Sequence, residues 1–531
     1  MKLKSLFCIG MAAISMCSCN NGGGQKMTHI PNQLRAPMYP LVTIDPYTSA
    51  WSASDKLFDS PVKHWTGKNF PLLGVAKVDG VSYRFMGDEE LELYPVCGTS
   101  EQEDWTGRYT VKQPVEGWEK ADFNDGAWKE GAGAFGTKEN EPTAKTQWGD
   151  EFIWVRRWID VKEDLSSKNL YLEYSHDDDV VIYINGIEIV STGNSAKKYQ
   201  YVKLPAEAIA SLKPGKNLIA AYCHNRVGNG LLDFGLMAEK DNTRCFTQTA
   251  DQTSVDAQAT QTYYSFTCGP VNLNIKFTAP LLMENLDLMT RPVNYLSYET
   301  VSNDGQAHDV SLYFEAAPQW AVDQPYQKSV SKTGSAEQNI LAKRGDDLRI
   351  DWGYFYMAAP QSENISVAAG DGIALRKAFV AGNSLDSQST GGFDKLVLSC
   401  DLGNEKNASG YVMLAYDDIY SIQYFGQNLR PYWNRNENET IFSQMKKAVA
   451  EYDGLMEQCT AFDSKLFTEA ENAGGREYAE LCALAYRQVM AAHKLVESPE
   501  GELLYLSKEN FSNGCINTVD LTYPSAPLFL V

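Results

Sequence analysis

The sequence lacks an excess of basic residues. Its 531 residues include 47 lysines and arginines against 68 aspartates and glutamates, so the net charge is −21. Nucleic acids are bound by positively charged surfaces that displace their counterions, and this composition offers no such surface. We therefore predict no nucleic-acid partner, and the charge balance fits an acidic, exported protein.

Long apolar runs are missing as well. Beyond the N-terminus no apolar stretch approaches the roughly 20 residues that cross a membrane as a helix. Lys2 and Lys4 precede a short apolar stretch, and Cys19 follows a small residue and precedes a polar, glycine-rich tether, which is similar to a bacterial lipobox. We expect residues 1–26 to be a lipoprotein signal and tether, lipidated at Cys19; an ordinary cleaved signal peptide is the alternative. The protein is then anchored to a membrane through this lipid only, in the periplasm or at the cell surface.

Signatures of metal sites and of common catalytic centres are absent. The eight cysteines beyond the signal segment form no CxxC pair and no Cys/His zinc spacing. Cys97 and Cys245 bracket one segment and could be bridged, but we predict no disulfide. There is no HExxH motif, no Ser-His-Asp order and no phosphate-binding glycine loop. We predict no metal and no cofactor; Asp177–Asp179 could bind a structural calcium, although solvated or turn-capping aspartates are the simpler interpretation.

Alternating apolar and polar residues dominate the first 435 residues. Asp79-Gly80 and Asn185-Gly186 each lie between two apolar runs, which is a strong hairpin signal. Residues 152–161, FIWVRRWIDV, alternate as a strand does, and another strand is expected around 218–222. Many short strands without a long helix predict antiparallel β-sandwiches.

The composition changes between residues 97 and 245. Tryptophans and phenylalanines are spread through a stretch poor in helix formers (118–136), and the earlier alternation resumes only at Ala257. We interpret this segment as one sandwich inserted into another, an arrangement that is tolerated when the ends of the insertion lie close together. The predicted domains are a discontinuous β-sandwich (27–96 and 246–435) and an inserted β-sandwich (97–245).

The hydrophobic period changes to that of a helix after residue 435. Apolar residues recur every three to four positions from Ile441 to Met456. A second helix is predicted from an apolar face made of Tyr478, Leu481, Cys482, Ala485, Val489, Ala492 and Val496. Asp463 is predicted to begin a short helix that ends at Gly474-Gly475, because paired glycines stop helices.

The last residues predict another helix. Ser525 can cap it, Pro527 suits its first turn, and four apolar residues follow up to Val531. These apolar residues need a partner face, which the preceding sequence does not supply. We interpret residues 436–531 as the start of a helical domain, in a chain that is β first and helical last.

Several long strings occur together in a fixed order. They are RAPMYPLVTIDPYTSAWS, HWTG, FTAPLLMENLDLMTRPVNYLSYE, RGDDLRIDWGYFYMAAP and SKENFSNGCINTVDLTYPSAPLFL. They resemble the glutaminase A family of fungi and bacteria over roughly residues 27–96 and 246–531. The resemblance implies an N-terminal β-sandwich followed by an (α/α) toroid of the six-hairpin type shared with many glycosidases. It also implies hydrolysis of L-glutamine to glutamate and ammonia.

The chain departs from this family in two respects. The family's helical domain continues past the last shared string, and a toroid needs successive hairpins to bury each other's faces, so we expect a chain cut within its catalytic domain and inactive alone. The segment 97–245 is similar instead to galactose-binding-like jelly rolls, such as the sugar-binding module of family 2 glycosidases. Its Trp118, Trp128 and Trp158 could stack on sugar rings, although core tryptophans are the simpler interpretation.

The loops after the second predicted helix carry the candidate site residues. Amide hydrolysis needs a general acid or base and a donor for the developing oxyanion. We take Glu509 and Asp520 as catalytic candidates, and Lys508, Asn510 and Tyr523 as substrate-binding candidates. Alternatively these residues hold the shape of their loops.

A second group of candidates lies in RGDDLRIDWGYFYMAAP. Asp351 and Trp352 are substrate-binding candidates, because carboxylates around Arg349 could line a cleft between sandwich and toroid. Alternatively Arg349 is an ion-pair centre that braces this interface.

We therefore predict a glutaminase-family amidohydrolase that acts on a small amino acid. The alternative is a glycoside hydrolase-like or carbohydrate-binding exported protein that acts on a glycan. Two carboxylates about 5–10 Å apart across a cleft would favour a glycosidase.

Overall fold

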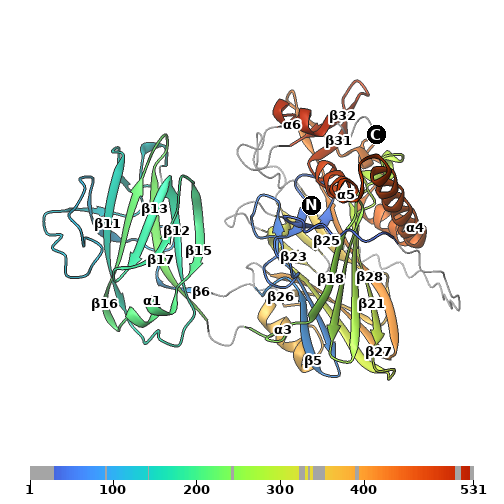
Figure 1. Cartoon of the computed structure of the whole chain (residues 1–531), viewed down its shortest axis with the longest axis horizontal. Coiled ribbons are helices and arrows are strands. Elements are labelled where there is room, and N and C mark those ends of the chain that lie inside the picture. The colour runs from blue at the N-terminus through green and yellow to red at the C-terminus, as the bar shows by residue number, and fades with distance from the viewer. Residues whose placement is uncertain are drawn as a thin grey trace, which may run out of the picture. The chain divides into compact units, whose positions relative to one another are not determined.

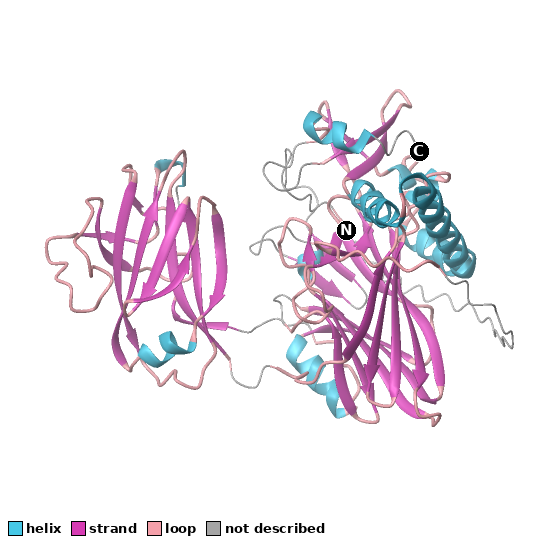
Figure 2. Cartoon of the chain, in the orientation of Figure 1, coloured by secondary structure: helices cyan, strands magenta, loops and turns pink. Residues whose placement is uncertain are grey.

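The computed structural model describes residues 29–89, 93–140, 143–240, 244–321, 329–332, 335–338, 353–388, 394–508 and 516–526. The chain divides into two compact units (Figure 1), which are Leu91–Thr243 and the remainder, Met1–Glu90 with Arg244–Val531. Strands make up most of both units, and the long helices follow the strands near the C-terminus (Figure 2). The chain is thus β-rich first and helical last, as predicted. In the part of the chain that the structure describes, no helix is long and apolar enough to cross a membrane.

The larger unit contains a sandwich of two antiparallel sheets. One sheet has the order β18 (Asp251–Ala257), β19 (Gln261–Cys268), β20 (Val271–Thr278), β21 (Val293–Ser302), β28 (Asn407–Asp417), β25 (Tyr354–Ala358), β24 (Ser335–Gln338) and β23 (Ser329–Lys332). The other has the order β26 (Ile365–Gly370), β27 (Lys395–Glu405), β22 (His308–Ala316), β4 (Leu72–Val78) and β5 (Val81–Met86). Their inward side chains share one core, in which Phe85 contacts both Phe266 and Phe314. A small sheet of β1 (Tyr39–Thr43), β2 (Ser49–Ser52) and β3 (Lys63–His64) packs into the same core.

The smaller unit is a second sandwich. One sheet has the order β10 (Thr146–Gln147), β9 (Phe135–Gly136), β17 (Leu231–Glu239), β12 (Leu170–Asp177) and β15 (Lys197–Lys203), with β6 (Leu93–Cys97) also on β17. The other has the order β14 (Ile187–Ser191), β13 (Asp179–Ile184), β16 (Gly215–His224), β11 (Phe152–Val161), β7 (Thr106–Thr110) and β8 (Lys129–Ala132). The short helices η1 (Lys138–Asn140) and α1 (Ala206–Ser211) complete the unit. Its apolar core draws only on its own residues.

Both predicted hairpins are confirmed. Asp79-Gly80 joins β4 to β5, and Asn185-Gly186 joins β13 to β14. Asp79 and Asn185 have φ of 49° and 48°, and the glycine after each has φ of 84°. This left-handed backbone is the conformation that Asp-Gly and Asn-Gly turns adopt at low cost.

The simpler interpretation of three tryptophans as core residues is wrong. Trp118, Trp128 and Trp158 are outside the core of the smaller unit, and Trp158 is 41% exposed. Trp158 lies on the outward face of β11, because strand residues alternate between faces and Ile159 beside it points into the core. The core tryptophans of this unit are Trp105 and Trp148.

The chain leaves and re-enters the larger unit at one point. Glu89 is buried, and its carboxylate accepts hydrogen bonds from the backbone N–H groups of Cys245 and Phe246, at 2.8 Å each. Asp88 forms an ion pair with Arg244. We call these contacts the clasp. The cysteine bridge considered from the sequence is absent, because neither Cys97 nor Cys245 is part of a disulfide.

The helices and small hairpins of the larger unit complete the fold. They are α2 (Leu286–Met289), η2 (Pro318–Trp320), α3 (Gly372–Ala381), β29 (Ile422–Tyr424), β30 (Gln427–Leu429), η3 (Tyr432–Asn434), α4 (Ile441–Gly474), α5 (Arg476–Ala491), β31 (His493–Glu497), β32 (Leu503–Ser507) and α6 (Val519–Ser525). Thr440 and Ser443 form a reciprocal capping box that begins α4. Buried residues of α4 then pack on Tyr295 and Met413 of the eight-stranded sheet.

The prediction that Asp463 begins a helix is wrong, although the predicted stop at Gly474 is confirmed. Asp463 lies inside α4, which runs without a break over 34 residues. Its buried carboxylate accepts hydrogen bonds from the backbone N–H and hydroxyl of Thr260, at 2.8 and 2.9 Å. Asp463 therefore attaches α4 to the sandwich and does not cap a helix.

The predicted apolar face of α5 is also wrong. Tyr478 and Leu481 are 50% and 54% exposed. The buried face is Ala479, Glu480, Ala483, Leu484, Tyr486, Arg487, Met490 and Ala491. Glu480 and Arg487 are buried because each finds a polar partner: Glu480 accepts from the N–H of Gln33, and Arg487 donates to the carbonyl of Ala259.

The second predicted helix ends earlier than expected. Ala491 is the last residue of α5, and Val496 belongs to the hairpin of β31 and β32. The alternating sequence His493–Glu497 and the turn that follows at Gly501 favour a hairpin over another helical turn. Similarly, Ser525 ends α6 and does not begin a helix, whereas Pro527 lies outside the described residues.

Candidate functional site

The structure describes three of the seven candidate site residues. Asp520 and Tyr523 lie on α6 with exposed side chains, and Tyr523 is 85% exposed. Lys508 follows β32 and is buried. Glu509, Asn510, Asp351 and Trp352 lie outside the described residues, as does Cys19. The site is therefore built from Lys508 outwards.

Lys508 is held at the junction of the sandwich and the helical part. Its backbone N–H donates to the carbonyl of Ala492 at 3.0 Å, which ties it to the end of α5. Its ammonium lies 5.5 Å from the ring centre of Tyr47, in the loop after β1. Tyr47 in turn packs with Tyr420 and Ile516. A cation over an aromatic face is attracted to it, so Tyr47 helps to hold the Lys508 side chain in this place.

Lys494 is the centre of a buried ion triad beside this lysine. Its Nζ lies 2.6 Å from Asp45 Oδ2 and 2.5 Å from Asp418 Oδ2. The three side chains are 8%, 2% and 5% exposed. Burial disfavours the charge on Lys494, but Asp418 and Asp45 together hold its pKa above the usual value. A permanently charged lysine is no nucleophile, and its role here is to position the two carboxylates.

Both carboxylates of the triad are fixed by further hydrogen bonds. Asp45 Oδ1 accepts the backbone N–H groups of Tyr47 and Thr48, at 2.9 and 2.8 Å, which shapes the loop that carries Tyr47. The hydroxyl of Ser421 donates to Asp418 Oδ2 at 2.5 Å. Lys494 thereby joins a loop after β1, the end of β28 and the hairpin after α5.

Asp417 is the group in this region that is suited to proton transfer. Burial and the neighbouring Asp418 raise its pKa to about 6. A carboxyl group with a pKa close to neutral can both donate and accept a proton at working pH. Asp417 is the last residue of β28 and pairs there with Tyr354 of β25.

A small cavity of about 20 Å³ lies beside the triad, lined by Lys494, His493 and Tyr505 among others. This space holds about one water molecule. The Nδ1 of His493 is 2.7 Å from the carbonyl of Val489 and must carry the proton, since a carbonyl only accepts. Burial lowers the pKa of His493, which favours the neutral form of its ring.

Sequence reasoning missed most of this triad. Asp45 stood in one of the strings shared with the family, but as one polar residue among many. Lys494 was not identified as a site residue, because the predicted second helix extended to Val496 and Lys494 was counted as part of it. Asp417 and Asp418 form an acidic pair whose burial the sequence does not show.

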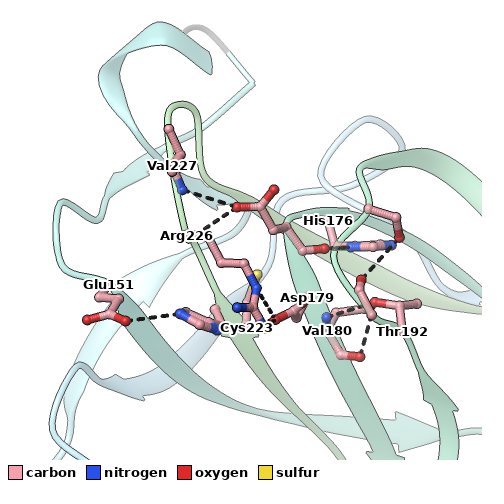
Figure 3. A network of polar contacts seen from close by, with 12 residues as sticks. Glu151, His176, Asp179, Val180, Thr192, Cys223, Arg226 and Val227 are labelled. Carbon is pink, nitrogen blue, oxygen red and sulfur yellow. Dashed lines mark hydrogen bonds and ion pairs between the residues drawn. The ribbon is translucent and has the colours of Figure 1, made fainter. Parts of the chain in front are cut away.

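Two of the three consecutive aspartates of the smaller unit, Asp178 and Asp179, brace the loop that contains Arg226 (Figure 3). Asp179 Oδ2 forms an ion pair with Arg226 at 2.6 Å and lies 3.2 Å from Nδ1 of His224. Asp178 accepts the backbone N–H groups of Arg226 and Val227. No group of three or more His, Cys, Asp or Glu side chains within the described ranges could hold a metal ion. The aspartates therefore fit a loop brace better than a calcium site.

Three family models match the chain. Residues 12–98 match a domain of unknown function, DUF4964, and residues 260–469 match another, DUF5127. Residues 475–531 match the glutaminase A six helical-hairpin domain.

Two curated proteins are similar to the chain. Glutaminase A of Aspergillus oryzae is 26% identical over 309 residues, which cover 54% of this chain and 44% of that protein. A protein of Arthroderma benhamiae named "Probable glutaminase" is 21% identical over 300 residues, which cover 49% of this chain and 33% of that protein. The matched region thus spans less than half the length of these relatives.

Solved structures show only weak likeness. A β-glucuronidase of Bacteroides uniformis has 13% identity and a TM-score of 0.23, with 43% of this chain and 32% of that chain covered. A β-glucuronidase of Ruminococcus gnavus in complex with uronic isofagomine has 11% identity and a TM-score of 0.22, with 43% and 41% covered. These scores are too low to support a conclusion about fold or function.

Proposed function

Since the chain belongs to a glutaminase A-like family, we propose that the protein is a glutaminase-family amidohydrolase that converts L-glutamine to glutamate and ammonia. The observation that carries the proposal is the match of residues 475–531 to the glutaminase A helical-hairpin model. The chemistry needs no cofactor, because water attacks an amide and ammonia leaves. The relatives are longer than the matched region, so the activity is proposed for the whole protein.

The junction around Lys494 is the proposed reaction site. Asp417, with its pKa near 6, accepts a proton from the attacking water and later returns it to the leaving ammonia. The ammonium of Lys508 stabilises either the oxyanion or the substrate carboxylate. Lys494 keeps Asp45 and Asp418 in place around them. Glu509 and Asp520 remain catalytic candidates, and Asn510, Tyr523, Asp351 and Trp352 remain substrate-binding candidates.

Helices α4 and α5 are proposed as the first hairpin of an (α/α) toroid. Tyr478 and Leu481, which are half-exposed and three residues apart on one side of α5, support this, because a further hairpin of the toroid would cover them. The domain boundaries proposed from the sequence are 27–96 with 246–435, 97–245 and 436–531. Export with a lipid on Cys19 completes the proposal.

Ammonia release tests the activity. We expect the protein purified from its intact gene to release ammonia from L-glutamine, and Asp417→Asn to lower kcat by about 100-fold or more while the protein stays folded. Asp453→Asn, an exposed acid on α4, is the matched control and should keep full activity. Absence of ammonia release between acid and alkaline pH would overturn the assignment.

A glycan-directed function is the second candidate. The exposed Trp158 favours it, together with the half-buried Trp118 and Trp128, because sugar rings stack on accessible aromatic rings. Arg156 organises this face: it is fully buried and donates to Asp125 and to the carbonyl of Lys120. Binding on a glycan array that is lost in Trp158→Ala would support this function, and an array without any ligand would remove it.

A further inference from the structure

A groove of about 410 Å³ lies on the larger unit between α4 and the segment that contains α2. One wall is formed by Asn285, Asp287 and Arg291, and the other by Ala450, Glu451, Gly454, Leu455 and Gln458 of α4. The buried side chains Leu288 and Leu455 also line it. Its volume is in the range of pockets that hold small molecules. It shares no residue with the junction around Lys494.

Gly454 has no structural reason to be a glycine. It lies inside α4, where glycine is less favourable than alanine. A Cβ added at Gly454 would meet only Gln458 Nε2, at 4.0 Å, so no neighbour requires the small residue. Because Gly454 lines the groove, its missing side chain serves to keep the groove open.

The charges of the groove are balanced across its two walls. The exposed carboxylate of Asp287 stands on one wall, with its Oδ1 2.7 Å from Nη1 of Arg435, and the carboxylate of Glu451 stands on the other. The Nη1 of Arg291 is 2.8 Å from Glu451 Oε2, while its buried Nε has no hydrogen-bond partner in the described structure. Gln458 adds an exposed primary amide, and Asn285 adds the NH2 group of a second one, whose oxygen already accepts the N–H of Leu288 at 3.1 Å. The groove therefore offers anionic, cationic and amide groups within one small volume.

This combination excludes several ligand classes. One arginine that is already ion-paired, facing two carboxylates, does not favour a phosphate. None of the described residues that line the groove is aromatic, so they offer no ring for the stacking that binds sugars. Two carboxylates are too few for a metal site made by the protein alone. A small zwitterion remains, because it brings an ammonium and a carboxylate together.

We propose that this groove binds a free α-amino acid with a side-chain amide, at a site separate from the reaction centre. The ligand ammonium lies between Asp287 and Glu451, and its carboxylate takes the donors of Arg291. Its side-chain amide pairs with Asn285 or Gln458. Leu288 and Leu455 contact its methylene groups.

Equilibrium titration of the intact protein with L-glutamine tests the site, with Asp417→Asn as the background so that the ligand is not consumed during the measurement. We expect 4-aminobutanamide, which lacks the carboxylate, and glutaramate, which lacks the ammonium, each to bind at least tenfold more weakly. Gly454→Leu should remove one binding site while Tm stays equal or rises, since leucine favours the helix. Thr468→Leu makes a comparable replacement at an exposed α4 position away from the groove and should keep the site.

Three results would overturn the proposal: no binding of glutamine at millimolar concentration, equal binding of glutaramate, or an unchanged number of sites in Gly454→Leu. If Gly454→Leu does not fold, Glu451→Gln replaces it, because it removes one charge and keeps the shape of the wall. Ammonia release is measured separately. A protein that binds glutamine in the groove but does not hydrolyse it would refute the proposed function and leave the groove assignment intact.

Discussion

Lys494 joins three chain segments that are far apart in sequence. Its ammonium contacts Asp45 and Asp418, and all three side chains are nearly inaccessible to water. An ion group of this kind adds little stability over an apolar substitute, but it cannot lose one member without cost. The triad therefore specifies how the hairpin after α5 meets the sandwich.

Lys494→Met should destabilise the protein by about 3–5 kcal/mol, because two buried carboxylates then lose their cation. Urea unfolding followed by circular dichroism measures the change. Lys447→Met is the matched control: Lys447 pairs with Glu439 at a partly exposed position, where loss of the pair costs less than about 1 kcal/mol. Equal losses in the two variants would contradict a special role for Lys494.

His308 links two turns of the larger unit and makes part of the stability dependent on pH. Its Nδ1 is 2.7 Å from Asp79 and its Nε2 is 3.0 Å from Asp304. Hydrogen bonds to Asp304 and Asp79 raise the pKa of His308, and the bond to His308 is the main cause that lowers the pKa of Asp304 to about 2. The protonated ring is thus stabilised by folding.

The contribution of His308 should be complete below about pH 6.5 and fade as the pH rises through its raised pKa. On the acid side, the contribution of Asp304 should fade below about pH 4 as the carboxylate takes up a proton. Calorimetry should therefore show wild type melting above His308→Gln at pH 5.5, with a smaller gap at pH 9. A gap that stays constant over this range would show that the histidine charge is irrelevant.

At the scale of elements, α4 is attached to the sandwich by apolar packing and by one buried carboxylate. Asp463 accepts both donors of Thr260, and burial raises the pKa of this carboxyl to about 7. Arg487 of α5, fully buried nearby, opposes that rise. Asp463 thus serves the docking of two helices at once.

Asp463→Ala should destabilise the protein by about 2–5 kcal/mol, because it leaves the buried N–H of Thr260 without its acceptor and removes the carboxyl group near Arg487. Glu457→Ala, at an exposed position of the same helix, should change the stability by less than about 0.5 kcal/mol. Denaturant titration of both variants measures the two changes in the free energy of unfolding. A loss in Asp463→Ala no larger than in Glu457→Ala would mean that the other contacts of α4 dock the helix without Asp463.

Elements were predictable from the sequence where local chemistry decides them. The Asp79 and Asn185 turns need a left-handed backbone, and the residues that adopt it cheaply are visible in the chain. The buried face of α5 was not predictable, because Glu480 and Arg487 are buried by partners that lie hundreds of residues away. The triad was hidden for the same reason. Only folding brings Asp45, Asp418 and Lys494 together.

At the scale of the whole molecule, we expect the larger unit to fold without the smaller one. Its apolar core uses only residues of its own. In the larger unit, the clasp of Glu89 with Cys245 and Phe246 holds together the two chain segments that flank the insertion. Each unit thus satisfies the requirements of an independent folding unit.

Replacing residues 91–243 by a short glycine-serine linker should leave the larger unit folded, with Tm within a few degrees of its transition in the intact protein. The reason is that the clasp already fixes the ends, so the linker closes only a short loop. Calorimetry of the shortened protein, and of residues 91–243 alone, should each show one cooperative transition. Loss of cooperative melting in the shortened protein would show that the larger unit depends on the insertion.

The clasp also has a practical consequence. Glu89 joins the chain segments directly before and directly after the insertion. We therefore expect the fold of the larger unit to be independent of the inserted sequence. A fluorescent protein, an affinity tag or another enzyme could therefore be inserted here in place of residues 91–243, and we expect the larger unit to keep its fold.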